Sequence, residues 1–472
     1  MITFILNNQL VKTENASGGS LLDFIRYGMD LPGTKVGCRE GDCGACTVLE
    51  GKLEGGKVIY KSIVSCLTPL GNAHGKHIVT IEGINMENLS PIQNSFVANA
   101  ATQCGFCTPG FIMSLTGHSL SFEKSTKQKA IASVSGNICR CTGYKSIEKA
   151  AEDISSLLKD KNIENPVSWL VEKKFLPKYF LDIPQRLEKI EKSSISTDGN
   201  EIIIAGGTDL MVQKAEEISE SQVNLFQERN DLKGIKTANR QCVIGAATTA
   251  SEIASSELIN ELIPDISSHF KLVSSEPIRN MGTVAGNIVN ASPIGDLSIM
   301  LLALNANVEI SNGKTIPLKE FYLGYKKLAL PKGEHIKSVS FPILSKPSVF
   351  SFEKVSKRTH LDIASVNSAI QILMDGEKIK ECFISAGGVG PIPMFLSKTC
   401  DFLKGKSICN ETLIKANSVM QDEISPISDV RGSVEYKRLL LRQLLFAHFI
   451  KLFPDRIDVN KLRSSILSKQ IE

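Results

Sequence analysis

Eight of the twelve cysteines in this chain lie in one stretch of the sequence and form two groups of four. In the first group, four residues separate Cys38 from Cys43 and two separate Cys43 from Cys46. The fourth member, Cys66, follows at a distance. Loops with this spacing hold a two-iron, two-sulfur ([2Fe–2S]) cluster through four thiolates. The first group therefore predicts such a cluster.

Three glycines interrupt this first cysteine loop, at Gly37, Gly41 and Gly44. A loop that wraps a cluster must turn its thiolates inward without its own side chains colliding. Glycine allows positive φ angles and close approach of the backbone. Backbone N–H groups that point at the sulfur atoms also tune the reduction potential of a cluster.

The second group consists of Cys104, Cys107, Cys139 and Cys141. Either pair alone is a weak signal, but together the pairs supply the four ligands of a second cluster. Pro109 follows Cys107 and suits the first turn of a helix. We therefore expect this pair at a helix start, where the positive end of the helix dipole stabilises a negatively charged cluster.

Zinc sites, disulfides and buried thiols are the alternatives. Zinc sites with four cysteines are usually built from two closely spaced pairs, which the first group lacks. Disulfides need an oxidising compartment, and residues 1–8 show no basic segment followed by a long apolar one. The scattered Cys242, Cys382, Cys400 and Cys409 are expected to be small buried hydrophobic residues.

Composition limits the class of protein. A chain of 472 residues is expected to form two to four domains. Its 42% hydrophobic and 22% charged content is typical of a soluble globular protein. A net charge of only +4 argues against a nucleic-acid binder, and no apolar run approaches the roughly 18 residues of a membrane helix. We expect a cytoplasmic protein without membrane contact.

The patterning predicts five segments. Residues 1–83 predict a β-grasp, ferredoxin-like [2Fe–2S] domain, with two short strands joined at Asn7 and Asn8. Residues 84–160 predict a helical [2Fe–2S] domain with helices at 91–100, 109–119, 126–135 and 145–159. The remaining segments are a linker at 161–175, a third domain at 176–347 and an α+β C-terminal domain at 348–472.

Two stretches of the third domain suggest a further cofactor. Residues 201–210 form a buried-strand pattern that ends in Gly206 and Gly207, and consecutive glycines expose N–H groups that suit a diphosphate. Residues 278–296 are rich in small and amide side chains and end in Asp296. Alone, the first stretch also fits a tight turn and the second a polar surface loop. Together, and beside two redox clusters, they favour a third redox centre.

These motifs resemble a known family over nearly the whole chain. Residues 37–46, 103–110 and 136–144 look like the iron–sulfur signatures of the xanthine oxidase family of molybdenum hydroxylases. Residues 205–210 and 282–296 look like its FAD-binding domain, of the vanillyl-alcohol-oxidase (PCMH) type. The resemblance implies an α+β multidomain protein that ends in a flavoprotein domain like that of CO dehydrogenase. Its arrangement is most like the small subunit of two-chain bacterial xanthine dehydrogenases.

The resemblance also implies ligands for two [2Fe–2S] clusters and FAD. The cluster ligands are Cys38, Cys43, Cys46, Cys66, Cys104, Cys107, Cys139 and Cys141. The FAD-binding residues are Ile204, Ala205, Gly206, Gly207, Thr208, Asp209, Leu210, Met211, Thr283, Val284, Ala285, Gly286, Asn287, Asp296 and Lys354. Ala285 stands where some members have glycine, and its methyl group would crowd the phosphate.

The family further implies a division of labour. A partner chain would carry molybdopterin and hydroxylate a purine, hypoxanthine or xanthine, with oxygen from water. Electrons would pass through the Cys104 group, then the Cys38 group, to FAD and on to NAD. We expect an obligate complex with two copies of each chain.

Two other interpretations stay open. The chain could serve an aldehyde or N-heterocycle hydroxylase, which differs in the partner's pocket. It could also be an accessory iron–sulfur protein without catalysis, which would have no need of stoichiometric FAD. The residues themselves favour an electron conduit, because clusters carry single electrons and a flavin takes one or two.

Overall fold

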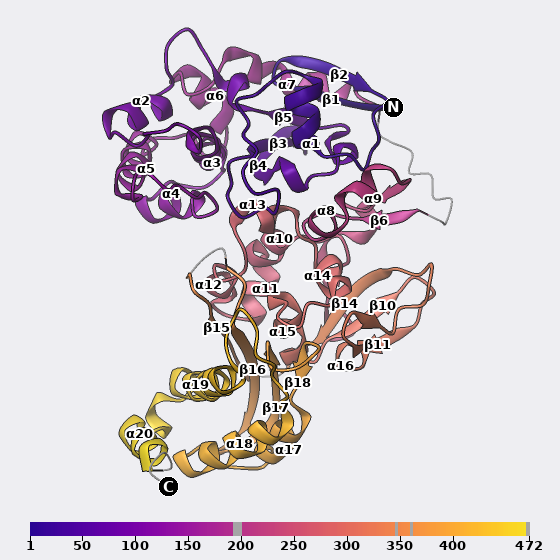
Figure 1. Ribbon diagram of the computed structural model, residues 1–472, viewed down its shortest axis with the longest axis vertical. Helices are drawn as coiled ribbons and strands as arrows, with labels where there is room; N and C mark the ends of the chain where they lie inside the picture. Colours follow the sequence, from indigo (N-terminus) through magenta and orange to yellow (C-terminus); the bar gives the residue numbers. More distant parts are fainter. Residues whose placement is uncertain (192–200, 345–347, 359–361, 469–472) are drawn as a thin grey trace. The chain divides into compact units, whose positions relative to one another are not determined.

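The computed structural model describes residues 1–191, 201–344, 348–358 and 362–468 (Figure 1). The chain divides into two compact units. Unit 1 comprises Met1–Glu228 and Ser275–Gly282, and unit 2 comprises Arg229–Ser274 and Thr283–Glu472. Among the described helices, none is both long and apolar enough to cross a membrane.

Unit 1 begins with a five-stranded mixed sheet in the order β2-β1-β5-β3-β4. Its elements are β1 (Ile2–Leu6), β2 (Gln9–Thr13), α1 (Leu21–Asp23), β3 (Thr47–Glu54), β4 (Lys57–Val64) and β5 (His77–Val79). Strands β1 and β2 form the predicted hairpin, and Asn7 takes the left-handed conformation at its turn. Strand β5 pairs parallel with β1 and antiparallel with β3, as in a β-grasp sheet.

Four helices follow, as the periodicity predicted. They are α2 (Pro91–Ala98), α3 (Thr108–Leu120), α4 (Lys127–Ser133) and α5 (Lys145–Leu157). The Ser90 hydroxyl accepts the Gln93 amide, and the Gln93 side chain in turn accepts the Ser90 amide, so a capping box starts α2. Helix α3 packs on β3 and β4, which joins the helices to the sheet in one hydrophobic core.

The segment predicted as a linker, residues 161–175, is partly helical and packed. It contains α6 (Pro166–Glu172), which starts where Asn165 caps the amide of Ser168. Leu170 and Phe175 are buried in the same core as the four helices. Apolar side chains at these positions hold the segment against the domain, which a polar linker would not allow.

The rest of unit 1 comes from the region predicted to bind FAD. It comprises α7 (Ile183–Glu188), β6 (Ile202–Ile204), α8 (Leu210–Gln213), α9 (Ala215–Ser219), β7 (Val223–Leu225) and α13 (Glu276–Met281). Strands β6 and β7 pair in parallel. Ile204, Met211 and Met281 share a hydrophobic core with Cys46 and Cys66 of the ferredoxin-like sheet.

Unit 2 contains an antiparallel sheet in the order β11-β10-β14-β9-β8. Its strands, with a small hairpin, are β8 (Ile235–Ala238), β9 (Gln241–Gly245), β10 (Asn307–Ile310), β11 (Thr315–Pro317), β12 (Tyr322–Gly324), β13 (Lys327–Leu328) and β14 (Ile336–Pro342). Its helices are α10 (Ala250–Ser255), α11 (Glu257–Leu262), α12 (Ile266–Phe270), α14 (Val284–Asn290), α15 (Asp296–Ala303) and α16 (Leu318–Phe321).

A second antiparallel sheet of unit 2 has the order β15-β16-β17-β18. Its strands are β15 (Ser348–Val355), β16 (Val366–Asp375), β17 (Lys378–Gly387) and β18 (Met394–Phe395). The helices are α17 (Ser397–Leu403), α18 (Asn410–Glu423), α19 (Val434–Leu452) and α20 (Val459–Ser468). Helix α19 packs on β15 and β16, while α15 packs on β16 and β17.

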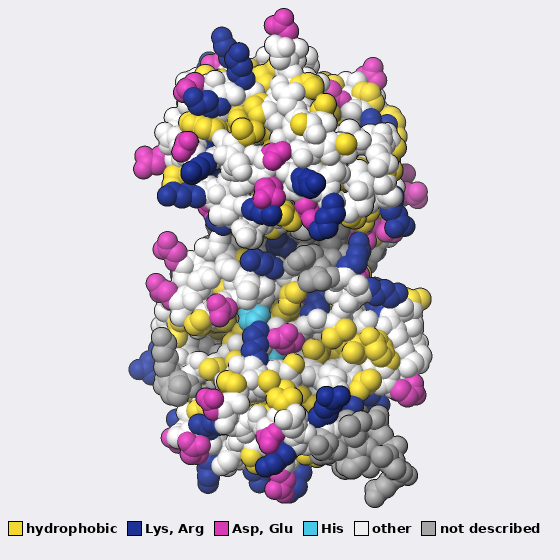
Figure 2. All heavy atoms as spheres, turned by 90° about the vertical axis from the view of Figure 1, so that its left-hand side faces the viewer, with side chains coloured by type: hydrophobic (Ala, Val, Ile, Leu, Met, Phe, Trp, Pro, Cys, Tyr) yellow, Lys and Arg dark blue, Asp and Glu magenta, His cyan; other side chains and the backbone are white. Residues whose placement is uncertain are grey.

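Charged side chains of both signs are interspersed on the face shown in Figure 2. No large area of this face carries a single sign of charge. A mixed surface of this kind agrees with the small net charge of the chain.

Candidate cofactor sites

The first four cysteines come together in the loop between α1 and β3 and the segment after β4. Cys46 and Cys66 are buried, and Cys38 and Cys43 are partly exposed. The backbone amides of Glu40 and Cys43 donate to Cys38 Sγ at 3.3 and 3.4 Å. Hydrogen bonds from the Cys43 thiol and from these amides lower the pKa of Cys38 to about 5. The loop therefore favours a thiolate at Cys38.

The four thiols stand as two pairs. The Cys43 thiol donates to Cys38, and the Cys66 thiol donates to Cys46. These hydrogen bonds lower the pKa of Cys46 and raise that of Cys66 well above its ordinary value. Four thiols arranged two by two are the donor set for two tetrahedral irons, and so they fit a [2Fe–2S] cluster.

The glycines of the loop are required by close contacts. A Cβ atom at Gly37 would lie 2.6 Å from Cys43 Sγ. Gly41 has φ +78°, and a Cβ atom there would lie 2.7 Å from Leu67 Cδ1. The space around the thiols thus exists only because these side chains are absent, as predicted for a cluster-binding loop.

The second four cysteines form two pairs as well. Cys141 Sγ lies 3.5 Å from Cys104 Sγ, and Cys107 and Cys139 share a hydrogen bond. Cys107 is the N-cap of α3, so the prediction of a helix start at this pair is confirmed. Cys104 and Cys141 are exposed, whereas Cys139 is buried.

Hydrogen bonds also reach the sulfur of Cys139. The Thr142 amide and hydroxyl donate to Cys139 Sγ at 3.4 and 3.1 Å. The backbone amide of Cys139 donates to the Tyr144 hydroxyl at 3.1 Å. Within the described ranges, no three His, Cys, Asp or Glu side chains are arranged to hold a single metal ion. Each cysteine group consists instead of two pairs of thiols.

The two cysteine loops touch each other. The backbone amide of Ile138, the residue before Cys139, donates to the carbonyl oxygen of Cys43 at 2.9 Å. Helix α3 meets the first loop at Gly110, where a Cβ atom would lie 2.3 Å from Gly44 O. A single hydrogen bond therefore connects Cys43 of the first group to the residue next to Cys139 of the second group.

The Gly206–Gly207 turn lies against the first cysteine group in unit 1. A Cβ atom at Gly207 (φ +77°) would lie 2.3 Å from the carbonyl oxygen of Leu67, which follows Cys66. The Asn72 side chain donates to the carbonyl oxygen of Ala205 at 2.9 Å. Among the described residues, the backbone amides of Gly206, Gly207 and Thr208 donate to no backbone carbonyl outside helices and strands. Three such amides in one turn fit a diphosphate.

The second predicted stretch lies in unit 2. Thr283 caps α14, where its hydroxyl accepts the Gly286 amide at 3.2 Å. The side-chain oxygen of Asn287 accepts the amide and hydroxyl of Ser298 at 3.2 and 3.0 Å. Val284 is fully buried, so its side chain faces the core. The Thr283 hydroxyl and the Asn287 side-chain oxygen thus brace the loop from within.

Asp296 and Lys354 are each other's partner. The Lys354 Nζ donates to Asp296 Oδ2 at 2.7 Å and to the carbonyl oxygen of Leu272 at 2.8 Å. The Asn367 side chain donates to Asp296 Oδ1 at 2.6 Å. Burial raises the pKa of Asp296 and the Lys354 ammonium lowers it, and burial prevails. Both carboxylate oxygens are already engaged, so this pair supports the predicted site by holding α15 against β15 and β16.

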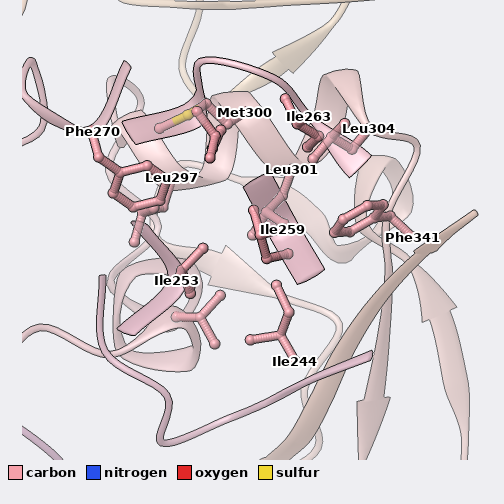
Figure 3. A pocket seen from close by; sticks show the side chains of 12 residues that line it. Ile244, Ile253, Ile259, Ile263, Phe270, Leu297, Met300, Leu301, Leu304 and Phe341 are labelled. Atoms are coloured by element: carbon pink, nitrogen blue, oxygen red, sulfur yellow. The ribbon is translucent and has the colours of Figure 1, made fainter. Parts of the chain in front are cut away.

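A cavity of about 30 Å³ lies in unit 2 behind α14 and α15. Figure 3 shows side chains such as Ile259, Met300 and Phe341 pointing into it. Its lining is wholly apolar and includes Val284 and Leu297. An apolar space of this size stays dry, so it holds neither a flavin nor its phosphates.

Several polar residues around these sites were not predicted individually. Asn137, Thr142 and Tyr144 lie inside the quoted cysteine motifs, where their polar side chains were the available signal. Asn72 and Asn367 have no local signal, because their partners lie 133 and 71 residues away in the sequence.

Three of the four remaining cysteines are buried, as expected. They are Cys242, Cys382 and Cys400. The prediction was wrong for Cys409, which is exposed. Cys409 is the N-cap of α18, and its sulfur lies 3.3 Å from the Thr412 hydroxyl. Cys409 thus remains in contact with solvent at the start of this helix.

Four family models match the chain in succession. They are a 2Fe-2S iron-sulfur cluster binding domain at residues 4–70, a [2Fe-2S] binding domain at 80–152, an FAD binding domain in molybdopterin dehydrogenase at 183–344, and a CO dehydrogenase flavoprotein C-terminal domain at 351–452. These matches confirm the predicted α+β multidomain fold class.

Among curated proteins, the chain is 28% identical to a xanthine dehydrogenase of Blastobotrys adeninivorans, over 95% of this chain and 40% of that protein. It is 29% identical to a xanthine dehydrogenase of Oryza sativa subsp. japonica, over 91% and 38%. It is 26% identical to aldehyde oxidase 2 of Mus musculus, over 96% and 39%. The chain thus spans about 40% of the length of these relatives.

Two solved structures are also similar. A Cu,Mo-CO dehydrogenase in its cyanide-inactivated form has 25% identity and a TM-score of 0.49, over 52% of this chain and 86% of that one. A quinoline 2-oxidoreductase from Pseudomonas putida 86 has 23% identity and a TM-score of 0.49, over 54% and 90%.

Proposed function

The chain belongs to the xanthine oxidase family of molybdenum hydroxylases as its iron–sulfur and FAD part, and from this premise we propose that it carries electrons from purine hydroxylation to NAD. The oxidation of hypoxanthine or xanthine takes place on a partner chain that holds molybdopterin. When bound, the two clusters supply one-electron steps and FAD pairs the electrons. We further propose a complex with two copies of each chain.

One observation carries this proposal. In unit 1 the second cysteine group, the first cysteine group and the Gly206–Gly207 turn follow one another in direct contact. The first contact is the hydrogen bond from the Ile138 amide to the Cys43 carbonyl. The second is the approach of Gly207 to the carbonyl oxygen of Leu67, next to Cys66. Such an order of sites suits a conduit from an outer cluster to a flavin.

The chain's own residues have distinct roles in this proposal. The eight cysteines of the two groups hold the clusters, and amides such as that of Glu40 stabilise thiolate charge. The amides of residues 206–208 bind the FAD diphosphate. Residues 283–287 are the second proposed FAD-binding stretch, and within unit 2 Asp296 and Lys354 brace the region that follows it.

The xanthine specificity is tested with the native complex under anaerobic conditions. Xanthine is added, and the flavin and iron–sulfur absorbance is followed before NAD is supplied. Bleaching that NAD reverses supports the proposed donor, conduit and acceptor together. Absence of bleaching with xanthine, but full bleaching with dithionite, refutes the purine specificity and keeps electron transfer.

An aldehyde hydroxylase is the second candidate, because aldehyde oxidase 2 of Mus musculus is nearly as similar to the chain as the xanthine dehydrogenases are. The same experiment with an aromatic aldehyde in place of xanthine distinguishes the two. Bleaching by the aldehyde alone would favour this candidate.

A further inference from the structure

Asn137 lies between the two cysteine loops and bonds to both sides of their contact. Its Nδ2 donates to the carbonyl oxygen of Gly44 at 3.0 Å. The Ser114 hydroxyl donates to its Oδ1 at 2.7 Å. Gly44 follows Cys43 in the first loop, and Ser114 lies on α3, whose N-cap is Cys107. One side chain therefore joins elements that carry ligands of both groups.

This side chain is buried and matched to its partners. Asn137 is 4% exposed and Ser114 is 1% exposed. A buried amide that loses its partners is costly, whereas its satisfied form fixes the geometry around it. Asn137 is thus suited to hold the two loops in one relative position.

The backbones on either side leave no room for another side chain. A Cβ atom at Gly44 (φ +66°) would lie 2.3 Å from the carbonyl oxygen of Gly136 and 2.6 Å from Asn137 Nδ2. A Cβ atom at Gly110 would lie 2.3 Å from the carbonyl oxygen of Gly44. Asn137 is the side chain that these glycines enclose.

The enclosed contact contains a bonded path between the two ligand groups. The path runs from the Cys139 thiolate along the backbone to the Ile138 amide, and across 2.9 Å to the Cys43 carbonyl. From there it follows the Cys43 backbone and side chain to the Cys43 thiolate. Only one of its steps is not a covalent bond.

We propose that Asn137 is a positioning residue for electron transfer between the two clusters. It holds the two loops together so that the hydrogen bond from the Ile138 amide to the Cys43 carbonyl stays formed. With both clusters bound, this path would carry one electron from the second cluster, which would be oxidised, to the first, which would be reduced; no bond would break and no proton would move. The inference rests on the proposed function, because both clusters must be present. Asn137 itself binds neither cluster.

The test uses the full chain with both clusters assembled, verified by iron and sulfide analysis. Asn137→Asp keeps the shape of the side chain and removes its donor to Gly44 O. Ser114→Ala removes the hydroxyl that holds Asn137 Oδ1. Ser119→Ala is the matched control, because Ser119 is equally buried on α3 but donates to Leu115 O of its own helix.

Two readouts are independent of turnover. One is the magnetic splitting between the two reduced clusters in low-temperature electron paramagnetic resonance spectra. The other is the rate at which an electron equilibrates between the clusters after flash reduction. We expect Asn137→Asp and Ser114→Ala to retain both clusters, to change the splitting and to slow the exchange several-fold. Ser119→Ala should leave both quantities unchanged.

Unchanged splitting and exchange in Asn137→Asp with both clusters present would overturn the inference. Equal slowing in Ser119→Ala would also overturn it, because the effect would then come from general loosening of α3. So would loss of iron in Asn137→Asp with unchanged exchange in Ser114→Ala, since the role of Asn137 would then be purely structural. A parent chain that assembles no clusters would instead refute the proposed function.

Discussion

Lys76 holds a buried charge network whose loss should destabilise unit 1. Its ammonium contacts Glu50 at 2.8 Å and Glu228 at 3.0 Å, and its side chain is 2% exposed. Burial lowers the pKa of Lys76, but the two carboxylates outweigh burial and raise the pKa above its ordinary value. The network joins strand β3 to Glu228, three residues after β7 ends, and so it ties the ferredoxin-like sheet to the segment after the β6–β7 pair.

Lys76→Met leaves the buried Glu50 carboxylate without its cation. Removal of one partner of a buried ion pair costs about 3–5 kcal/mol. We expect the lower part of this range, because Glu228 is partly exposed and keeps Lys52 at 2.8 Å. For a unit of this size, about 3–4 kcal/mol corresponds to a fall of roughly 6–16 °C in the melting temperature.

The assay is thermal loss of the visible iron–sulfur absorbance of the assembled chain. Lys52→Met is the matched control, because its side chain is 30% exposed in the same network and should cost no more than about 1 kcal/mol. The double variant Lys76→Met with Glu50→Leu removes the stranded charge and should recover most of the loss. Equal melting temperatures for Lys76→Met and Lys52→Met would refute the argument.

Three further predictions concern pH, loop geometry and cluster ligands. Burial, and to a smaller extent the charges of Lys451 and His269, lowers the pKa of His448 to about 3. Between about pH 6.5 and 3 this histidine is therefore protonated in the unfolded state but neutral in the folded state. The free energy of unfolding should fall by about 1.4 kcal/mol for each pH unit as the pH drops from about 6.5 toward 3. His448→Gln should reduce that slope in denaturant titrations of the chain, and an unchanged slope would contradict it. Gly44→Ala should lower the iron content of the chain, because the new Cβ atom would collide with the carbonyl oxygen of Gly136. Gly55→Ala is the control: Gly55 has φ +57° and nothing within 4 Å of its Cβ position. This control should cost only about 1–2 kcal/mol of backbone strain and keep its iron. Cys104→Ser should remove the spectrum of one cluster and retain that of the other, while the buried Cys382→Ser should keep both; loss of iron from Cys382→Ser would argue against the assigned ligands.

Local rules explain what could be predicted before the structure. The spacing of Cys38, Cys43 and Cys46 reflects the size of the cluster that one loop must wrap, so it is visible in nine residues of sequence. The four helices of residues 91–157 have their own periodicity, and three of them begin next to a proline or a capping hydroxyl. The bounds of the linker at 161–175 stay a prediction, and the structure adds that Leu170 and Phe175 of this segment pack into the core.

By itself, the sequence determined the two cysteine groups, the order of the elements and the family, because these follow from short spacings and periodic patterns. Only the tertiary structure decided which polar groups meet. Asn137 and Gly44 are 93 residues apart, and Asn72 and Ala205 are 133 apart. Such pairs leave no local pattern, since each becomes a neighbour only when distant segments pack. The contacts between the sites could therefore be read only from the tertiary structure, whereas the predicted cluster ligands could be read from the sequence.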